Sequence, residues 1–178
     1  MDKLIIEGGV PLTGVVHVSG SKNAALPILM GSILLDEPVT YTNVPDLRDI
    51  RTTFKLLELL GCPNAFENGQ VTVTPVALSP AAPSELVKTL RASVLVLGPL
   101  LARSGFARVS LPGGCAIGAR PINFHLRGFE QLGVVTRLEQ GYVEAVAEGR
   151  MHGGTVYFDV PSVTGTENVL MASVAAPG

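Results

Sequence analysis

An internal repeat is the feature of this sequence that most restricts its fold. The segment LLELLGCPNAFENGQVTV, residues 56–73, aligns without a gap with GFEQLGVVTRLEQGYVEA, residues 128–145. Each copy predicts a helix closed by a C-cap glycine, then a strand, a two-residue turn with glycine second, and another strand. One helix and strand unit is therefore expected to occur at least twice along the chain.

Each copy is preceded by an apolar helix and a short strand, in residues 23–45 and again in 91–113. A further apolar helix begins in TENVLMASVAAPG, residues 166–178. The sequence thus predicts an α/β fold with two full units of helix, strand, helix, strand, strand and the start of a third. The richest apolar runs, 26–35 and 94–102, are about half of the ~20 residues that a membrane-spanning helix needs, so we expect buried helices.

Composition restricts the function. With 47% hydrophobic and 16% charged residues the composition is that of a globular chain, and the mean hydropathy of +0.40 is high for a soluble protein. A net charge of −2, with 5% aromatic residues and no Trp, argues against nucleic-acid binding. The beginning of the sequence has no charged leader before a long apolar stretch, so a cytoplasmic protein is expected. No metal site is expected, since Cys62, Cys115, His17, His125 and His152 are scattered without zinc-ligand spacing.

Both ends of the sequence differ from the repeated plan. The segments KLIIEGG, residues 3–9, and GVVHVSG, residues 14–20, predict a strand pair that precedes the first unit. The last helix stops before its following strand. Because such a helix would leave an apolar face and a sheet edge unpaired, we expect the chain to be part of something longer or to depend on another piece.

Polar residues gather just before each apolar helix, in GSKN (20–23), KTLRAS (88–93) and PSVTGTEN (161–168). Helix N-termini present free N–H groups and the positive end of the helix dipole, which favour a bound anion. Ordinary helix capping is the alternative at any one of them. The repetition, together with the cations Lys22 and Arg91, favours a phosphate-bearing ligand held at one end of the fold.

A glycine-rich segment, LPGGCAIGAR at 111–120, carries Cys115 and Arg120. It predicts a mobile lid in which the guanidinium lowers the thiol pKa, as a nucleophile or proton donor requires. The alternative for Cys115 is a small buried hydrophobic residue. Cys62 corresponds to Val134 in the repeat, which favours a core role. His125 is either a ligand contact or an ordinary capping or surface histidine.

Four motifs of the sequence strongly resemble those of bacterial UDP-N-acetylglucosamine 1-carboxyvinyltransferases. They are GSKNAALPIL, RAS at 91–93, LPGGCAIGARPINFHLRGFEQLG and PSVTGTENVLMA. The resemblance runs over residues 1–178. The sister 5-enolpyruvylshikimate-3-phosphate synthases share the fold but lack GGCAIGARP. The resemblance implies an inside-out α/β barrel, the enolpyruvyl transferase fold, with two domains of three repeated units each. The resemblance also implies that this chain is truncated, at less than half the family's length.

The resemblance also implies a division of the chain. Residues 1–21 would be a strand pair belonging to a domain otherwise absent, and residues 22–178 would form the substrate-binding domain. The missing C-terminal part of the enzyme is the expected structural partner. Because that part supplies the catalytic aspartate, the chain alone is expected to be inactive. A phosphate- or nucleotide-binding module without turnover, or the sister synthase, is the alternative.

The implied reaction transfers the enolpyruvyl group of phosphoenolpyruvate to the 3-hydroxyl of UDP-N-acetylglucosamine, with release of phosphate and without any cofactor. It is the step that opens peptidoglycan precursor synthesis. Cys115 would be the catalytic thiol, as adduct former or as proton donor, and the group that fosfomycin alkylates. Residues Lys22, Asn23 and Arg120 would bind phosphoenolpyruvate. The UDP-sugar would contact Asn23, Arg91, Arg120, Pro121, Ile122, Asn123, Phe124, His125, Ser162, Val163 and Thr164.

Two positions depart from the family pattern. Position 123 is Asn where some members have Asp, which puts an acidic contact to uracil in doubt. Position 164 is Thr where Gly is common.

Overall fold

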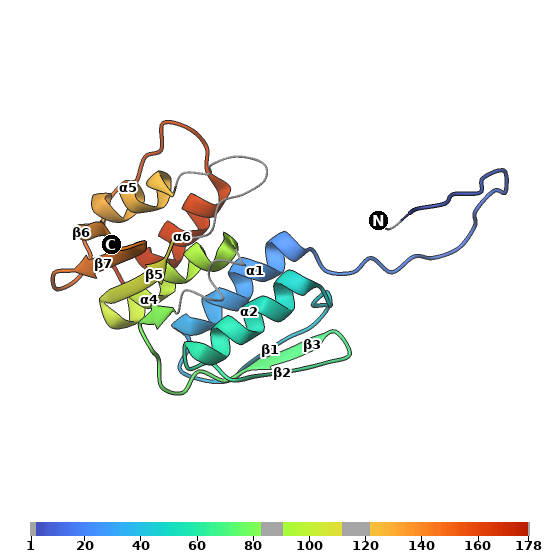
Figure 1. Ribbon diagram of the computed structural model, residues 1–178, viewed down its shortest axis with the longest axis horizontal. Coiled ribbons are helices and arrows are strands. Elements are labelled where there is room, and N and C mark those ends of the chain that lie inside the picture. The colour runs from blue at the N-terminus through green and yellow to red at the C-terminus, as the bar shows by residue number, and fades with distance from the viewer. Residues whose placement is uncertain (1–2, 83–90, 112–121, 178) are drawn as a thin grey trace.

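The computed structural model describes residues 3–82, 91–111 and 122–177, with the backbone alone described at position 91. Its described elements form two successive units and the first helix of a third (Figure 1). The first unit comprises α1 (Lys22–Gly31) with the 3-10 turn η1 (Ser32–Leu34), β1 (Val39–Tyr41), α2 (Arg48–Leu59), β2 (Asn64–Glu67) and β3 (Gln70–Val73). Its antiparallel sheet has the strand order β1-β3-β2.

The second unit repeats this order and adds one short strand. It comprises β4 (Ala81–Ala82), η2 (Arg91–Val96) leading into α4 (Leu97–Ser104), β5 (Phe106–Ser110), α5 (Asn123–Gln131), β6 (Val134–Glu139) and β7 (Tyr142–Ala147). Its sheet has the order β4-β5-β7-β6, in which β4 alone runs parallel to its neighbour. Helix α6 (Val163–Ser173) begins a third unit. The predicted order of elements is therefore confirmed, whereas the two-residue strand β4 had no sequence signal.

The repeat is visible at the level of single backbone angles. Asn68 and Gly69, between β2 and β3, have φ of 50° and 75°, and Gln140 and Gly141, between β6 and β7, have 49° and 80°. Two successive positive φ angles define the type I′ turn, which matches the twist of a hairpin. The two hairpins predicted from Asn-Gly and Gln-Gly are thus built in the same way.

The two helix ends that precede these hairpins are also alike. Gly61 and Gly133 follow α2 and α5 with φ of 89° and 79°. Their N–H groups donate to the carbonyls of Glu58 and Glu130 at 3.1 and 3.0 Å. In the first unit Cys62 N–H also donates to the Leu57 carbonyl at 2.8 Å, which completes a Schellman motif.

Substituting Gly61 tests how tightly this helix end is packed. A Cβ there would meet the carbonyl oxygen of Ala77 as well as adopt a left-handed φ, whereas a Cβ at Gly141, φ 80°, would meet nothing within 4 Å. Gly61→Ala is therefore expected to destabilise the fold by about 2 kcal/mol and Gly141→Ala by about 1 kcal/mol. Thermal unfolding of the two variants checks this difference. Equal losses of stability in the two variants would mean that backbone strain alone, without the contact to Ala77, determines the cost at position 61.

The apolar helices occupy the interior and the sheets lie outside them. Helix α4 packs against α6, and α1 packs against η2. Leu29, Met30, Leu97 and Leu100 on these helices are fully buried. The sheets present alternate residues to the helices, as the buried and less buried positions along β3 and β7 show. Burial of the helices between peripheral sheets is the arrangement that the sequence predicts for an inside-out α/β fold.

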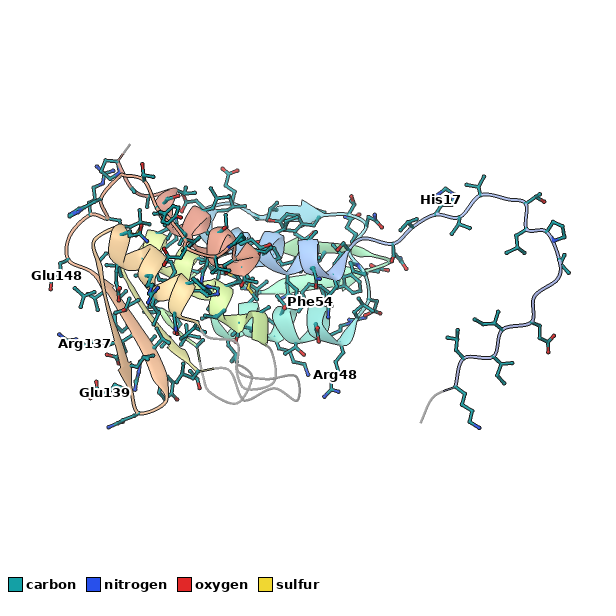
Figure 2. All side chains as sticks on the ribbon, turned by 90° about the horizontal axis from the view of Figure 1, so that it is seen from above. His17, Arg48, Phe54, Arg137, Glu139 and Glu148 are labelled. Carbon is teal, nitrogen blue, oxygen red and sulfur yellow. The ribbon has the colours of Figure 1, made fainter. Side chains whose placement is uncertain are left out.

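The helices share a common direction. In Figure 1, α1, α2, α5 and α6 each begin at their right-hand end and run toward the left. The first residues of these helices therefore face the same way; they are Lys22, Arg48, Asn123 and Val163. This agrees with the prediction for the segments 20–23 and 161–168, whereas residues 88–90 lie outside the described ranges. The β6–β7 hairpin with Arg137 and Glu139 lies at the other end (Figure 2).

Residues 3–19 form an extended arm that leaves the body of the molecule, with His17 on it (Figures 1 and 2). The sequence predicts a strand pair at 3–9 and 14–20. This prediction is wrong for the structure, because the arm contains no strand. Leu4, Ile5 and Ile6 are at least 80% exposed. A two-stranded ribbon is marginal without an apolar layer beneath it, and the arm packs on none. The division at residue 21 remains a prediction.

No helix in the described part of the chain is long and apolar enough to cross a bilayer.

Candidate functional site

The start of α1 is held in place by a close backbone contact. Gly20 N–H donates to Asn43 Oδ1 at 3.0 Å, and a Cβ on Gly20 would collide with the Asn43 carbonyl oxygen. Asn43 itself has φ 56°, a left-handed conformation that Asn tolerates better than most residues. Glycine at position 20 therefore lets the chain approach the loop before α2 and fixes where Lys22 and Asn23 emerge.

Lys22 forms an ion pair with Asp49 in the first turn of α2. The distance from Lys22 Nζ to Asp49 Oδ2 is 2.7 Å, and the side chains are 42% and 40% exposed. A pair this exposed adds little to stability, so its main effect is to orient the ammonium group between two helix starts. Asn23 is exposed beside it. Asp49 was not predicted from the sequence, since nothing local links it to Lys22.

The starts of α5 and α6 also meet. Ser162 caps α6 by accepting a hydrogen bond from Gly165 N–H at 3.1 Å. A Cβ on Gly165 would lie 2.8 Å from Ser162 Oγ and 3.4 Å from the Phe124 Cβ, so glycine there allows the two helix starts to touch. Two segments predicted separately as UDP-sugar contacts, 122–125 and 162–164, are thus brought together. Val163, Thr164 and Asn123 are exposed, and Ile122 is half-buried.

His125 lies behind this surface, with only 4% of the residue exposed. Its Nε2 is 3.3 Å from Thr164 Oγ1, and its Nδ1 is 2.9 Å from Asn168 Nδ2. Burial lowers the pKa of His125 to about 4, so the ring is neutral at physiological pH. Asn168 was not singled out from the sequence. Its partners are distant along the chain, and a polar residue in an apolar helix was the only available signal.

The remaining predicted site residues lie largely outside the described residues. Cys115, Arg120 and Pro121 fall within 112–121, and the side chain of Arg91, at the start of η2, is likewise not described. Cys62 is fully buried in the core, as the repeat predicts. Burial raises the pKa of its thiol to about 11, partly opposed by Arg103, so this cysteine is unsuited to nucleophilic chemistry.

Within the described ranges, no three His, Cys, Asp or Glu side chains lie close enough to hold a metal ion. The groups at this end of the fold include the Lys22 ammonium with its partner carboxylate Asp49, amides, hydroxyls and helix N-termini. The hydrogen-bond donors among them are of the kind that bind anions and polar hydroxyl-bearing molecules. The fold and the site together define a class: an α/β protein of repeated units with its helices inside, whose aligned helix starts carry hydrogen-bond donors.

Comparison with known families agrees with this class. Residues 6–178 match the family described as EPSP synthase (3-phosphoshikimate 1-carboxyvinyltransferase), and the chain belongs to this family. The UDP-N-acetylglucosamine 1-carboxyvinyltransferase of Nitratidesulfovibrio vulgaris strain Hildenborough is 64% identical over all 178 residues of the chain. The enzyme of the same name from Idiomarina loihiensis is 54% identical over 180 aligned residues. The chain spans 42% and 43% of the lengths of these two relatives.

Solved structures show the same fold. The enolpyruvyl transferase NikO from Streptomyces tendae superimposes with a TM-score of 0.77 at 23% identity, over 96% of this chain and 40% of NikO. An EPSP synthase from Acinetobacter baumannii gives 0.71 at 19% identity, over 93% of this chain and 39% of that one. The enolpyruvyl transferase fold expected from the sequence motifs is confirmed.

Proposed function

We propose that the protein to which this chain belongs transfers the enolpyruvyl group of phosphoenolpyruvate to the 3-hydroxyl of UDP-N-acetylglucosamine. The observation that carries the proposal is the 64% identity, over the entire chain, to an enzyme named for this reaction. The relatives that share only the fold are far less similar, at 19% to 23% identity. A sequence identity of 64% supports a shared substrate as well as a shared fold.

The described residues fit an assignment of roles. Lys22 and Asn23, at the start of α1, bind phosphoenolpyruvate, and the Lys22 ammonium stabilises the negative charge of the phosphate. The starts of α5 and α6 bind the UDP-sugar, with Ser162 to Thr164 near its diphosphate. Arg91, Arg120, Pro121 and Cys115 complete the site on the basis of the sequence motifs. The protein works in the cytoplasm, without a cofactor.

The chemistry is an addition followed by an elimination. The sugar 3-hydroxyl gives up its proton to a base as its oxygen bonds to C2 of phosphoenolpyruvate, and a proton is added to C3, which gives a tetrahedral intermediate. A proton then leaves C3 as the C2–O bond to phosphate breaks, so that the double bond reforms and inorganic phosphate departs. Cationic groups near the phosphate favour this last step, because they stabilise the charge that develops on the leaving group.

The second candidate acceptor is shikimate 3-phosphate, which the matching family description favours. The two acceptors differ in whether they carry a nucleotide. The assignment of residues 1–21 to a second domain and of 22–178 to the substrate-binding domain is common to both candidates.

Phosphate release tests the proposal. Full-length protein mixed with phosphoenolpyruvate is expected to release inorganic phosphate when UDP-N-acetylglucosamine is added and to release none with shikimate 3-phosphate. The 178-residue chain alone is expected to release none with either acceptor, because it spans only 42% of the length of the relative named for this activity. Release with shikimate 3-phosphate only would replace the proposal by the second candidate, and turnover by the chain alone would contradict the need for a second domain.

A further inference from the structure

Asn168 on α6 is fully buried and makes three hydrogen bonds at its amide. Its Oδ1 accepts from Gly98 N–H at 2.7 Å, and its Nδ2 donates to the Val94 carbonyl at 2.9 Å. The third bond joins Nδ2 to His125 Nδ1 at 2.9 Å. The amide has one orientation only. Reversing it would place NH2 against the Gly98 N–H and an oxygen against the Val94 carbonyl.

This fixed amide sets the state of His125. Because Asn168 Nδ2 can only donate, His125 Nδ1 must accept and carries no proton. A neutral imidazole then holds its proton on Nε2, and burial of the ring keeps it neutral. Nε2–H therefore donates to Thr164 Oγ1, 3.3 Å away.

The same logic sets the direction of the Thr164 hydroxyl. Since Oγ1 accepts from His125, its own hydrogen must point elsewhere. Thr164 is exposed and is the second residue of α6, where the helix dipole is positive. A hydroxyl held in this way offers a hydrogen-bond donor toward solvent at a site favourable to negative charge.

Building on the proposed function, we propose that Asn168 is a positioning residue which, through His125, holds the Thr164 hydroxyl as an outward donor to the diphosphate of UDP-N-acetylglucosamine. The chain of donors runs from Asn168 Nδ2 to His125, from His125 to Thr164, and from Thr164 to an acceptor oxygen of the ligand. The Thr164 hydroxyl, the last group of this chain, is thereby oriented to donate to a hydrogen-bond acceptor.

The first test needs no substitution. Nitrogen and carbon NMR shifts of the His125 ring in full-length protein without ligand report its tautomer. The neutral form protonated at Nε2 is expected throughout pH 5.5 to 8. A ring protonated at Nδ1, or at both nitrogens in this range, would overturn the inference whatever the protein binds.

The second test measures binding of UDP-N-acetylglucosamine by calorimetry. Thr164→Val is expected to weaken binding about tenfold, because it removes one hydrogen bond to a charged group, and Thr164→Ser is expected to restore most of the affinity. In a His125→Phe background the effect of Thr164→Val should shrink to about threefold or less, since the hydroxyl is no longer directed. In an Asn168→Ala background the effect of Thr164→Val should shrink to a similar extent.

The outcomes separate a positioning role from a structural one. If Asn168 and His125 only hold helices together, their variants will lower the melting temperature while Thr164→Val keeps its full effect in each background, and the inference fails. Should Asn168→Ala and His125→Phe not fold, the ring tautomer and the comparison of Val with Ser at position 164 still decide it. Wild-type protein that does not bind the UDP-sugar would overturn the proposed function as well. Binding that Thr164→Val leaves intact would overturn this inference alone.

Discussion

Lys22→Met in the full-length protein is expected to lower kcat/KM for phosphoenolpyruvate about a hundredfold. The substitution keeps an unbranched side chain one atom shorter and removes its charge, and a charge-assisted contact that is lost in the transition state costs about 2 to 3 kcal/mol. The fold should survive, since the ion pair with Asp49 is about 40% exposed at each side chain and so adds little stability. Steady-state phosphate release at varied phosphoenolpyruvate concentration measures the effect.

Asp49→Asn is the matched control for this prediction. It removes the same ion pair, at 2.7 Å, but leaves the ammonium group in place. If Lys22 acts by contacting substrate, Asp49→Asn should cost less than about tenfold in kcat/KM, because the ammonium remains available. Equal losses in the two variants would show that the ion pair itself, rather than the cation, is what matters, and near-normal activity of Lys22→Met would contradict the assigned role.

Acidification is expected to destabilise the region around His125 by up to about 3 kcal/mol. The folded pKa is about 4, below the value of 6.5 for an unperturbed histidine. As pH falls below about 6.5 the unfolded chain binds a proton that the folded chain does not, so the free energy of unfolding decreases. The loss grows down to about pH 4 and then levels off, since the folded state is protonated as well.

Hydrogen exchange of the α5 and α6 amides in the full-length protein, corrected for intrinsic rates, measures this loss between pH 7.5 and 4.5. His125→Gln should flatten the pH dependence in these helices, whereas His152→Gln, at an exposed position, should not. A wild-type profile that His125→Gln leaves unaltered would mean that other groups cause the acid sensitivity.

Local signals allowed much of the fold to be predicted. The hairpins at Asn68–Gly69 and Gln140–Gly141, and the helix end at Gly61, depend on backbone conformations that a few adjacent residues determine. The exposed arm at 3–19 was not predictable in the same way: the sequence predicts strands at 3–9 and 14–20, but a strand exists only with a partner. Local β propensity without that partner gives the exposed arm.

The site was predictable in its residue types but not in its contacts. Lys22 and Thr164 were identified from motifs, whereas their partners Asp49 and His125 lie 27 and 39 residues away. Asn168 reaches Val94 across 74 residues. Such pairings follow from how the helices pack, which no local pattern determines. The roles of Cys115, Arg120 and Pro121 stay predictions, since these residues lie outside the described ranges.

The contact between Gly98 and Asn168 has a consequence for how successive units align. Smooth apolar helices can slide along one another at small energetic cost, whereas a buried amide with three partners is satisfied at a single offset. A side chain at position 98 would displace α6 from that offset. The hydrogen bonds of Asn168 therefore fix the position of α6, the first helix of the third unit, along its axis relative to the second unit.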